Sequence, residues 1–192
     1  MEIKVEHISK AYGGKTVLND VSFIAVSGIM RVAGPSGAGK TTLMRILLGL
    51  ESADSGRVVI PERFRWAAVF QEDRLLENKT ALGNIRFALG SDYDEGAATK
   101  MLDELGLSDV GDKKVKDYSG GMKRRLALAR ALLAKSDGIV LDEPFTGLDE
   151  KNRDIALGCV INAAKNKTVL ICCHESLDIP ANLTVTLKIE QE

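Results

Sequence analysis

A glycine-rich segment, GPSGAGKT at positions 34–41, has the residue types and spacing of a phosphate-binding loop. It follows the predicted strand MRVAG, which runs to Gly34, and precedes a helical pattern of apolar residues. Such an order directs backbone N–H groups and the positive end of a helix toward one point, where phosphates bind. In this phosphate loop, Lys40 would contact the terminal phosphates of a nucleotide and the Thr41 hydroxyl would bind Mg²⁺. The competing interpretation is a tight turn that only connects a strand to a helix.

Two acids, Asp142 and Glu143, follow directly on the apolar run GIVL at 138–141. In open α/β sheets, ligands bind at the carboxyl ends of the strands. Asp142 would hold Mg²⁺ directly or through water, and Glu143 would polarise an attacking water molecule. Alone, such a pair is more often a solvated turn. The phosphate loop in the same chain favours the catalytic interpretation.

A second helix start with anion-binding character lies in YSGGMKRRLALARAL at 118–132. Ser119 is a candidate N-cap, and Gly120 and Gly121 would expose backbone amides. One ATP has a single γ-phosphate, which the phosphate loop already serves. An ordinary capped helix is the alternative, because Ser-Gly is common before a helix.

Strand and helix patterns alternate along most of the chain, which predicts an α/β sheet covered on both faces. Between about residues 78 and 134 the β pattern is absent, so this stretch is predicted to be a helical insertion. The expected strands include 16–26, 57–60, 66–70, 138–141, 168–173 and 184–189. The expected helix after the phosphate loop has an apolar face made of Leu43, Ile46, Leu47 and Leu50.

Composition excludes several classes of protein. Lys and Arg number 26 against 27 Asp and Glu, a net charge of -1, so the basic excess of a non-specific nucleic-acid binder is missing. No apolar run approaches the roughly 20 residues that span a bilayer. Cys159, Cys172 and Cys173 lack metal-site spacing, so we expect reduced, buried thiols.

Three of these motifs make the chain resemble the nucleotide-binding subunit of an ATP-binding-cassette (ABC) transporter. GPSGAGKT is similar to the Walker A motif, IVLDEP to Walker B, and YSGGM at 118–122 to the LSGGQ signature. This signature segment has Tyr118 and Met122 where leucine and glutamine are usual. The missing aspartate in NKTA at 78–81 argues against a guanine-specific GTPase.

Four further residues resemble family positions in the family order. Tyr12 is similar to the aromatic residue that stacks on adenine, and Gln71 in VFQED resembles the Q-loop. Asp149 in TGLDE resembles the D-loop, and His174 after TVLICC resembles the switch histidine. The resemblance therefore covers essentially the whole chain.

The resemblance implies an α/β P-loop NTPase with a RecA-like core sheet, an N-terminal antiparallel β part and a helical subdomain at about 78–134. Residues 1–192 would form a single ABC ATPase domain that hydrolyses ATP with Mg²⁺. The implied catalytic residues are Glu143, His174 and Gln71, and the implied metal ligands are Thr41, Gln71 and Asp142. The implied nucleotide contacts are Tyr12, Gly34, Pro35, Ser36, Gly37, Ala38, Gly39, Lys40, Thr41, Thr42, Ser119, Gly120, Gly121 and Asp149.

The same resemblance implies partners and a location. Two copies of this single-cassette chain would form a head-to-tail homodimer around two ATP. The homodimer would power a separate integral-membrane permease from the cytoplasmic face of the cell membrane. VFQEDRLLENKTALGNI is similar to nitrate, sulfonate and taurine-type importers, which would also use an extracytoplasmic substrate-binding protein, whereas SGGMKRR also occurs in exporter subunits. An importer is favoured; an exporter subunit and a soluble ABC-type ATPase without a permease are the alternatives. We expect no nucleic-acid partner.

Overall fold

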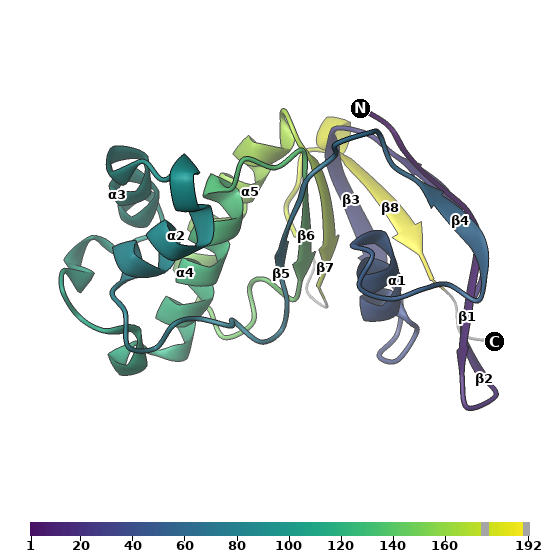
Figure 1. Ribbon diagram of the computed structural model, residues 1–192, viewed down its shortest axis with the longest axis horizontal. Coiled ribbons are helices and arrows are strands. Elements are labelled where there is room, and N and C mark those ends of the chain that lie inside the picture. The colour runs from purple at the N-terminus through teal and green to yellow at the C-terminus, as the bar shows by residue number, and fades with distance from the viewer. Residues whose placement is uncertain (174–176, 190–192) are drawn as a thin grey trace.

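Two sheets form the framework of the molecule in a computed structural model, which describes residues 1–173 and 177–189 (Figure 1). The 5-stranded sheet is parallel, in the order β5-β6-β7-β3-β8, and the 3-stranded sheet is antiparallel, in the order β2-β1-β4. The strands are β1 (Ile3–Tyr12), β2 (Lys15–Ala25), β3 (Gly28–Ala33), β4 (Ser55–Val59), β5 (Trp66–Val69), β6 (Gly138–Asp142), β7 (Thr168–Cys172) and β8 (Thr184–Lys188). The α-helices are α1 (Lys40–Leu47), α2 (Ala81–Leu89), α3 (Glu95–Glu104), α4 (Gly120–Leu133) and α5 (Glu150–Ala164). Short 3-10 turns lie at Gly90–Asp92, Ser108–Val110, Val115–Asp117 and Ala181–Leu183.

The central parallel strands are apolar on both faces because helices cover both faces. Every residue of β6 and β7 is buried. Along β6, Ile139 and Leu141 belong to the same buried cluster as residues of α4 and α5, whereas Val140 between them belongs to the cluster of α1. Figure 1 shows α1 and α5 on opposite sides of the sheet. This alternation is typical of a doubly covered parallel sheet and confirms the predicted α/β fold with its N-terminal antiparallel part.

The helix after the phosphate loop is shorter than its apolar pattern predicts. α1 ends at Leu47, because Gly49 takes a left-handed φ of 67° and closes the helix. Gly49 N donates to Ile46 O (3.0 Å) and Leu50 N donates to Arg45 O (2.9 Å), which is the hydrogen-bond pattern of a Schellman cap. Leu50 therefore lies beyond the helix and is 58% exposed, so its predicted place on the buried face is wrong.

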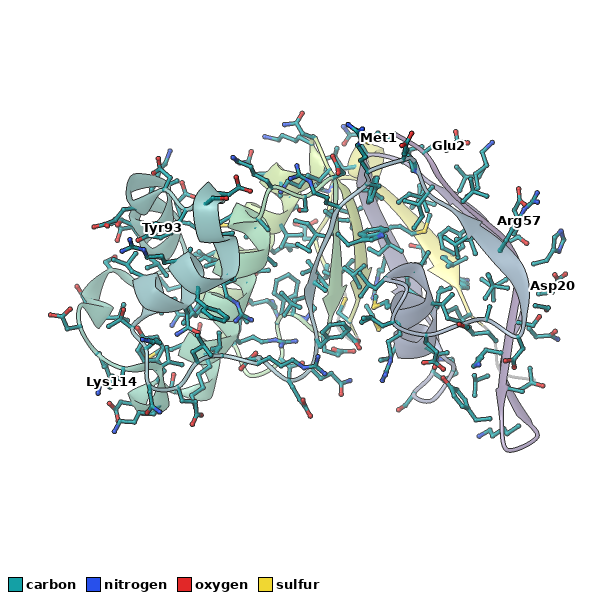
Figure 2. The ribbon with its side chains drawn as sticks, viewed as in Figure 1. Met1, Glu2, Asp20, Arg57, Tyr93 and Lys114 are labelled. Atoms are coloured by element: carbon teal, nitrogen blue, oxygen red, sulfur yellow. The ribbon has the colours of Figure 1, made fainter. Side chains whose placement is uncertain are left out.

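The described elements between β5 and β6 are helical. Side-chain oxygens of Thr80 and Asp94 cap α2 and α3. Ile85, Leu102 and Leu128, one from each of α2, α3 and α4, belong to one buried cluster. Figure 2 places these helices at one end of the molecule, marked by Tyr93 and Lys114, and the antiparallel sheet at the other, marked by Arg57 and Asp20.

The structure tests two further predictions, that no segment spans a membrane and that the three cysteines are buried thiols. Within the ranges 1–173 and 177–189, no helix combines the length and the apolar character needed to cross a membrane. Cys172 and Cys173 are buried thiols, as predicted. Cys159 is only partly buried, so the expectation of three buried thiols is wrong at this position on α5.

Candidate active site

The phosphate loop takes backbone conformations that only glycine tolerates at two positions. Gly37 and Gly39 have φ values of 79° and 86°. A Cβ atom on Gly39 would lie 2.3 Å from the Val17 carbonyl oxygen and 2.8 Å from Leu18 Cδ2, so β2 packs directly against the loop. Gly39 is also the N-cap of α1 and makes no side-chain cap, so the first amides of the helix have no side-chain acceptor there. This geometry suits an anion at the helix start.

Lys40 lies against its own loop. Its ammonium group donates to the carbonyl oxygens of Gly34 (2.8 Å) and Pro35 (2.7 Å), and only 8% of the residue is exposed. The positive charge is therefore held at the edge of a cavity of about 200 Å³, here called the loop cavity. The cavity lining includes the predicted nucleotide contacts Ser36, Gly37, Gly39, Lys40, Thr41 and Thr42, with Gln71, Asp142 and Glu143. Ala38 is fully buried.

Thr41 and Asp142 meet in the loop cavity although 101 positions separate them in the chain. The Thr41 hydroxyl donates to Asp142 Oδ2 at 2.8 Å, and Asp142 is 2% exposed at the carboxyl end of β6. The fold brings them together because β6, the second strand of the parallel sheet, shares a buried cluster with α1. A hydroxyl and a carboxylate oxygen are hard donors of the kind that Mg²⁺ prefers, so this pair fits the predicted metal site.

Glu143 follows Asp142 with a backbone conformation that is uncommon for a residue with a side chain. Its φ is 52°, in the left-handed region, at a typical cost of roughly 1–3 kcal/mol. Its N–H donates to the Cys172 carbonyl oxygen at 2.8 Å, and the Cys172 thiol lies 3.9 Å from Glu143 Oε1. Burial raises the pKa of Cys172 to about 12, so this thiol stays protonated and can donate to the carboxylate. In this conformation Glu143 lines the loop cavity, together with Cys172.

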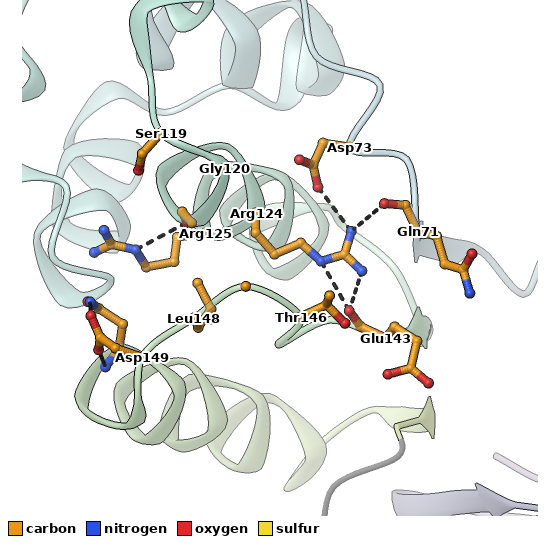
Figure 3. A pocket seen from close by; sticks show the side chains of 13 residues that line it. Gln71, Asp73, Ser119, Gly120, Arg124, Arg125, Glu143, Thr146, Leu148 and Asp149 are labelled. Atoms are coloured by element: carbon orange, nitrogen blue, oxygen red, sulfur yellow. Dashed lines mark hydrogen bonds and ion pairs between the residues drawn. The ribbon is translucent and has the colours of Figure 1, made fainter.

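The signature segment lines a second cavity of about 830 Å³, here called the signature cavity (Figure 3). The Ser119 hydroxyl caps α4 by accepting from Met122 N at 3.3 Å. A Cβ on Gly120 would meet nothing within 4 Å, whereas one on Gly121 would lie 3.2 Å from the Gly147 carbonyl oxygen. Gln71 and Glu143 line both cavities, but Lys40 and Thr41 are not among the described residues that line this one. Among the described residues, the phosphate loop and the signature segment therefore line different cavities, which adjoin at Gln71 and Glu143.

Tyr118 and Met122, the two residues that differ from the family signature, pack against the buried core. Tyr118 is 6% exposed and belongs to the buried cluster of α2, α3 and α4, and Met122 packs against the same cluster. Both side chains serve packing. The backbone of Gly120 between them stays at the surface of the signature cavity.

The remaining predicted site residues are Tyr12, Asp149 and His174. The Tyr12 hydroxyl donates to Glu51, and Tyr12, which is 46% exposed, is not among the described residues that line either cavity. Asp149 lines the signature cavity and caps α5, and its hydrogen bonds from the Asn152 backbone and side chain lower its pKa. His174 lies outside the described residues, so its predicted role has no structural counterpart here.

Sequence reasoning missed Arg124, which points from α4 to the junction between the two cavities (Figure 3). It is 4% exposed, which is unusual for a charged side chain. The available signal was a charged residue inside the mostly apolar pattern after the signature glycines. The same pattern also fits an amphipathic helix with a solvated face, so the sequence alone did not distinguish the two.

Comparisons with known proteins agree with this geometry. The family model described as ABC transporter matches residues 18–146. An aliphatic sulfonates import ATP-binding protein of Pseudomonas syringae pv. syringae is 42% identical over 180 residues, which cover 91% of this chain and 74% of that protein. A Nod factor export ATP-binding protein of Burkholderia orbicola is 37% identical over 189 residues, covering 90% of this chain and 62% of that protein. A solved ABC transporter ATP-binding protein from Pyrococcus furiosus has a TM-score of 0.87, 20% identity and 98% coverage of both chains. The last likeness confirms the predicted fold class.

Proposed function

Because this chain belongs to the ABC transporter family of ATP-binding proteins, we propose that it hydrolyses MgATP and drives a separate membrane permease. The observation that carries the proposal is the contact of 2.8 Å between Thr41 Oγ1 and Asp142 Oδ2 in the loop cavity. It joins the phosphate loop to the acidic end of β6, where Glu143 also lies. The residues proposed to bind phosphate, to bind metal and to activate water therefore line one cavity.

The residues of the loop cavity have distinct tasks in this proposal. Lys40 exchanges its two carbonyl acceptors for phosphate oxygens, and Thr41 and Asp142 hold the metal. Bound Mg²⁺ supplies charge neutralisation at the phosphates. Glu143 accepts a proton from the attacking water while the bond to the leaving ADP breaks, and positioning and electrostatics supply the rate. By the family resemblance, Gln71 contacts the metal or the water, and His174 holds the γ-phosphate.

A head-to-tail homodimer completes the site in this proposal. The signature segment and the phosphate-loop residues Lys40 and Thr41 line different, adjoining cavities among the described residues, so in this proposal the signature amides bind a nucleotide that another chain presents. In a two-fold dimer, each ATP lies between Lys40 of one chain and Ser119 of the other. The dimer then depends on ATP, because the charge of the triphosphate needs both halves of the site.

Transport is the second part of the proposal, with import as its direction. The relative from Pseudomonas syringae carries aliphatic sulfonates import in its name, and the segment after Gln71 resembles importers of that class. In this proposal the chain docks on a permease at the inner face of the membrane, with an extracytoplasmic binding protein on the other side. Export is the second candidate, because the relative from Burkholderia orbicola is named for Nod factor export.

A co-purification experiment tests the transport proposal. The chain is expressed with each polytopic membrane protein that its neighbouring genes encode, and the complex is isolated through a tag on the membrane protein. We expect the two to co-purify and, in vesicles with an extracytoplasmic binding protein, to accumulate an aliphatic sulfonate when ATP is supplied. Extrusion would favour the exporter alternative. An ATPase that neither binds nor responds to any membrane protein would support the soluble alternative.

Replacing Tyr12 tests the proposed adenine contact. We expect Tyr12→Ala to weaken ATP binding by about 1–3 kcal/mol, the usual contribution of base stacking, and Tyr12→Trp to preserve it. Tyr12→Phe removes only the bond to Glu51 and should also preserve affinity. Titration with ATP measures all four proteins. Equal affinities would show that Tyr12 serves only the packing of β1.

A further inference from the structure

Arg124 makes an unusually complete set of hydrogen bonds for a single side chain. On one side its guanidinium donates to the Asp142 carbonyl oxygen (Nη2, 2.7 Å) and to the Glu143 carbonyl oxygen (Nε, 3.2 Å; Nη2, 2.5 Å). On the other side Nη1 donates to the Phe70 and Gln71 carbonyl oxygens (2.5 and 3.4 Å) and pairs with Asp73 at 3.0 Å. One buried cation therefore joins the segments that follow β5 and β6.

The bonds to Glu143 fix a conformation that the residue would not adopt readily by itself. The N–H of Glu143 is held by the Cys172 carbonyl oxygen at 2.8 Å, and its carbonyl oxygen is held by Arg124. With both ends of the residue fixed, φ stays at 52° and the carboxylate stays at the loop cavity. A strained backbone persists where the surroundings over-determine it.

The position of Arg124 on α4 relates these hydrogen bonds to the signature segment. α4 begins at Gly120, so Arg124 stands one helical turn after the signature glycines. Its backbone is part of the element that carries the signature segment, while its side chain holds the catalytic end of β6 and the segment of Gln71. Figure 3 shows this guanidinium between Gln71, Asp73 and Glu143.

We propose that Arg124 is a positioning residue for hydrolysis, which holds Glu143 in register with the signature segment of the same chain. This inference rests on the proposed ATPase function. In the head-to-tail dimer, the signature segment engages the nucleotide held by the other chain, so Arg124 links that contact to the Glu143 of its own site. The hydrogen bonds described for Arg124 go to the segments after β5 and β6 and not to Lys40 or Thr41, so we expect its loss to affect turnover far more than ATP affinity.

The test compares Arg124→Lys with Arg130→Lys. Lysine keeps the buried charge but lacks the planar fork that reaches several acceptors at once. Arg130 is a matched control, because its side chain also extends from α4 to the segment after β5. It donates to the Asp73 and Arg74 carbonyl oxygens (both 3.0 Å), and neither of these bonds involves Glu143. We expect Arg124→Lys to lower kcat tenfold or more with an ATP Kd within twofold of wild type. Arg130→Lys should retain at least half of the wild-type kcat.

A double mutant separates positioning from general destabilisation. If Arg124 acts through Glu143, Arg124→Lys should cost less than twofold in a Glu143→Gln background, measured by single-turnover release of labelled phosphate. A further tenfold loss in that background would overturn the proposal. So would retention of more than half of kcat by Arg124→Lys, or a loss of ATP affinity as large as the loss of kcat.

An Arg124 variant that fails to fold also decides the test. Arg124→Gln places no charge of its own in the buried site and replaces Arg124→Lys if that variant does not fold. If neither folds while Arg130→Lys does, Arg124 is a folding residue and the proposal is wrong. A wild-type chain that fails to hydrolyse MgATP would instead contradict the proposed function, which separates the two failures.

Discussion

Glu143→Gln is expected to lower ATP turnover by 10²-fold or more while ATP still binds. The amide keeps the size of the side chain but cannot accept a proton from water, and losses of this scale are typical when a general base is removed. ATP binding should persist, because the proposed phosphate contacts come from Lys40 and the loop amides. Phosphate release under saturating MgATP measures turnover, and titration with ATP measures affinity.

Glu72→Gln is a suitable control for that loss. Glu72 follows Gln71, and its side chain is 83% exposed, so the same chemical change there should leave turnover nearly unchanged. If the Glu143→Gln protein keeps more than half of the wild-type kcat, Glu143 is not the base. The acidic pair after β6 would then only bind metal.

Gly120→Asp should abolish both ATP-dependent dimerisation and turnover while each chain still binds ATP. A Cβ at Gly120 meets nothing within 4 Å, so the new carboxylate fits without disturbing α4. A negative charge at the start of a helix is also favourable in the isolated chain. In the dimer, however, this carboxylate would face the γ-phosphate of the partner's nucleotide, where like charges repel.

Gly120→Asn is the matched control, because asparagine has nearly the same shape without the charge. It should retain more dimer and more turnover than Gly120→Asp, measured by sedimentation with ATP and by phosphate release. Gly121 is a poorer probe, since a Cβ there would lie 3.2 Å from the Gly147 carbonyl oxygen. If Gly120→Asp prevents ATP binding by the isolated chain, the signature segment belongs to the nucleotide site of its own chain, and the dimer proposal is wrong.

The sequence was most informative where local pattern decides structure. Uninterrupted apolar runs identified β6 and β7 because a parallel sheet buries both faces of its strands. The spacing of GPSGAGKT indicated a phosphate loop, and the structure holds two of its glycines, Gly37 and Gly39, in the left-handed region. Asp142 was predicted to serve the same metal as Thr41, and the two side chains do touch.

Features that depend on tertiary contacts could not be predicted in the same way. The partners of Arg124 come from the ends of β5 and β6, more than 15 positions away along the chain, and helical periodicity does not report them. The left-handed φ of Glu143 has no local sequence signal, since glycine is the residue expected there. Leu50 fits the apolar period of α1 but follows a glycine cap that ends the helix first.

A mixing experiment tests the composite ATP site most directly. Lys40→Ala and Gly120→Asp are each placed in the Glu143→Gln background and sedimented with MgATP, alone and together. Alone, the first chain lacks the lysine that holds phosphate and the second carries a repelling carboxylate, so both should stay monomeric. Their mixture offers one intact site, made of Lys40 from one chain and the signature segment from the other, and should form an ATP-dependent heterodimer. Monomers in the mixture under conditions where the Glu143→Gln parent dimerises, or dimers that form equally well without ATP, would contradict the account.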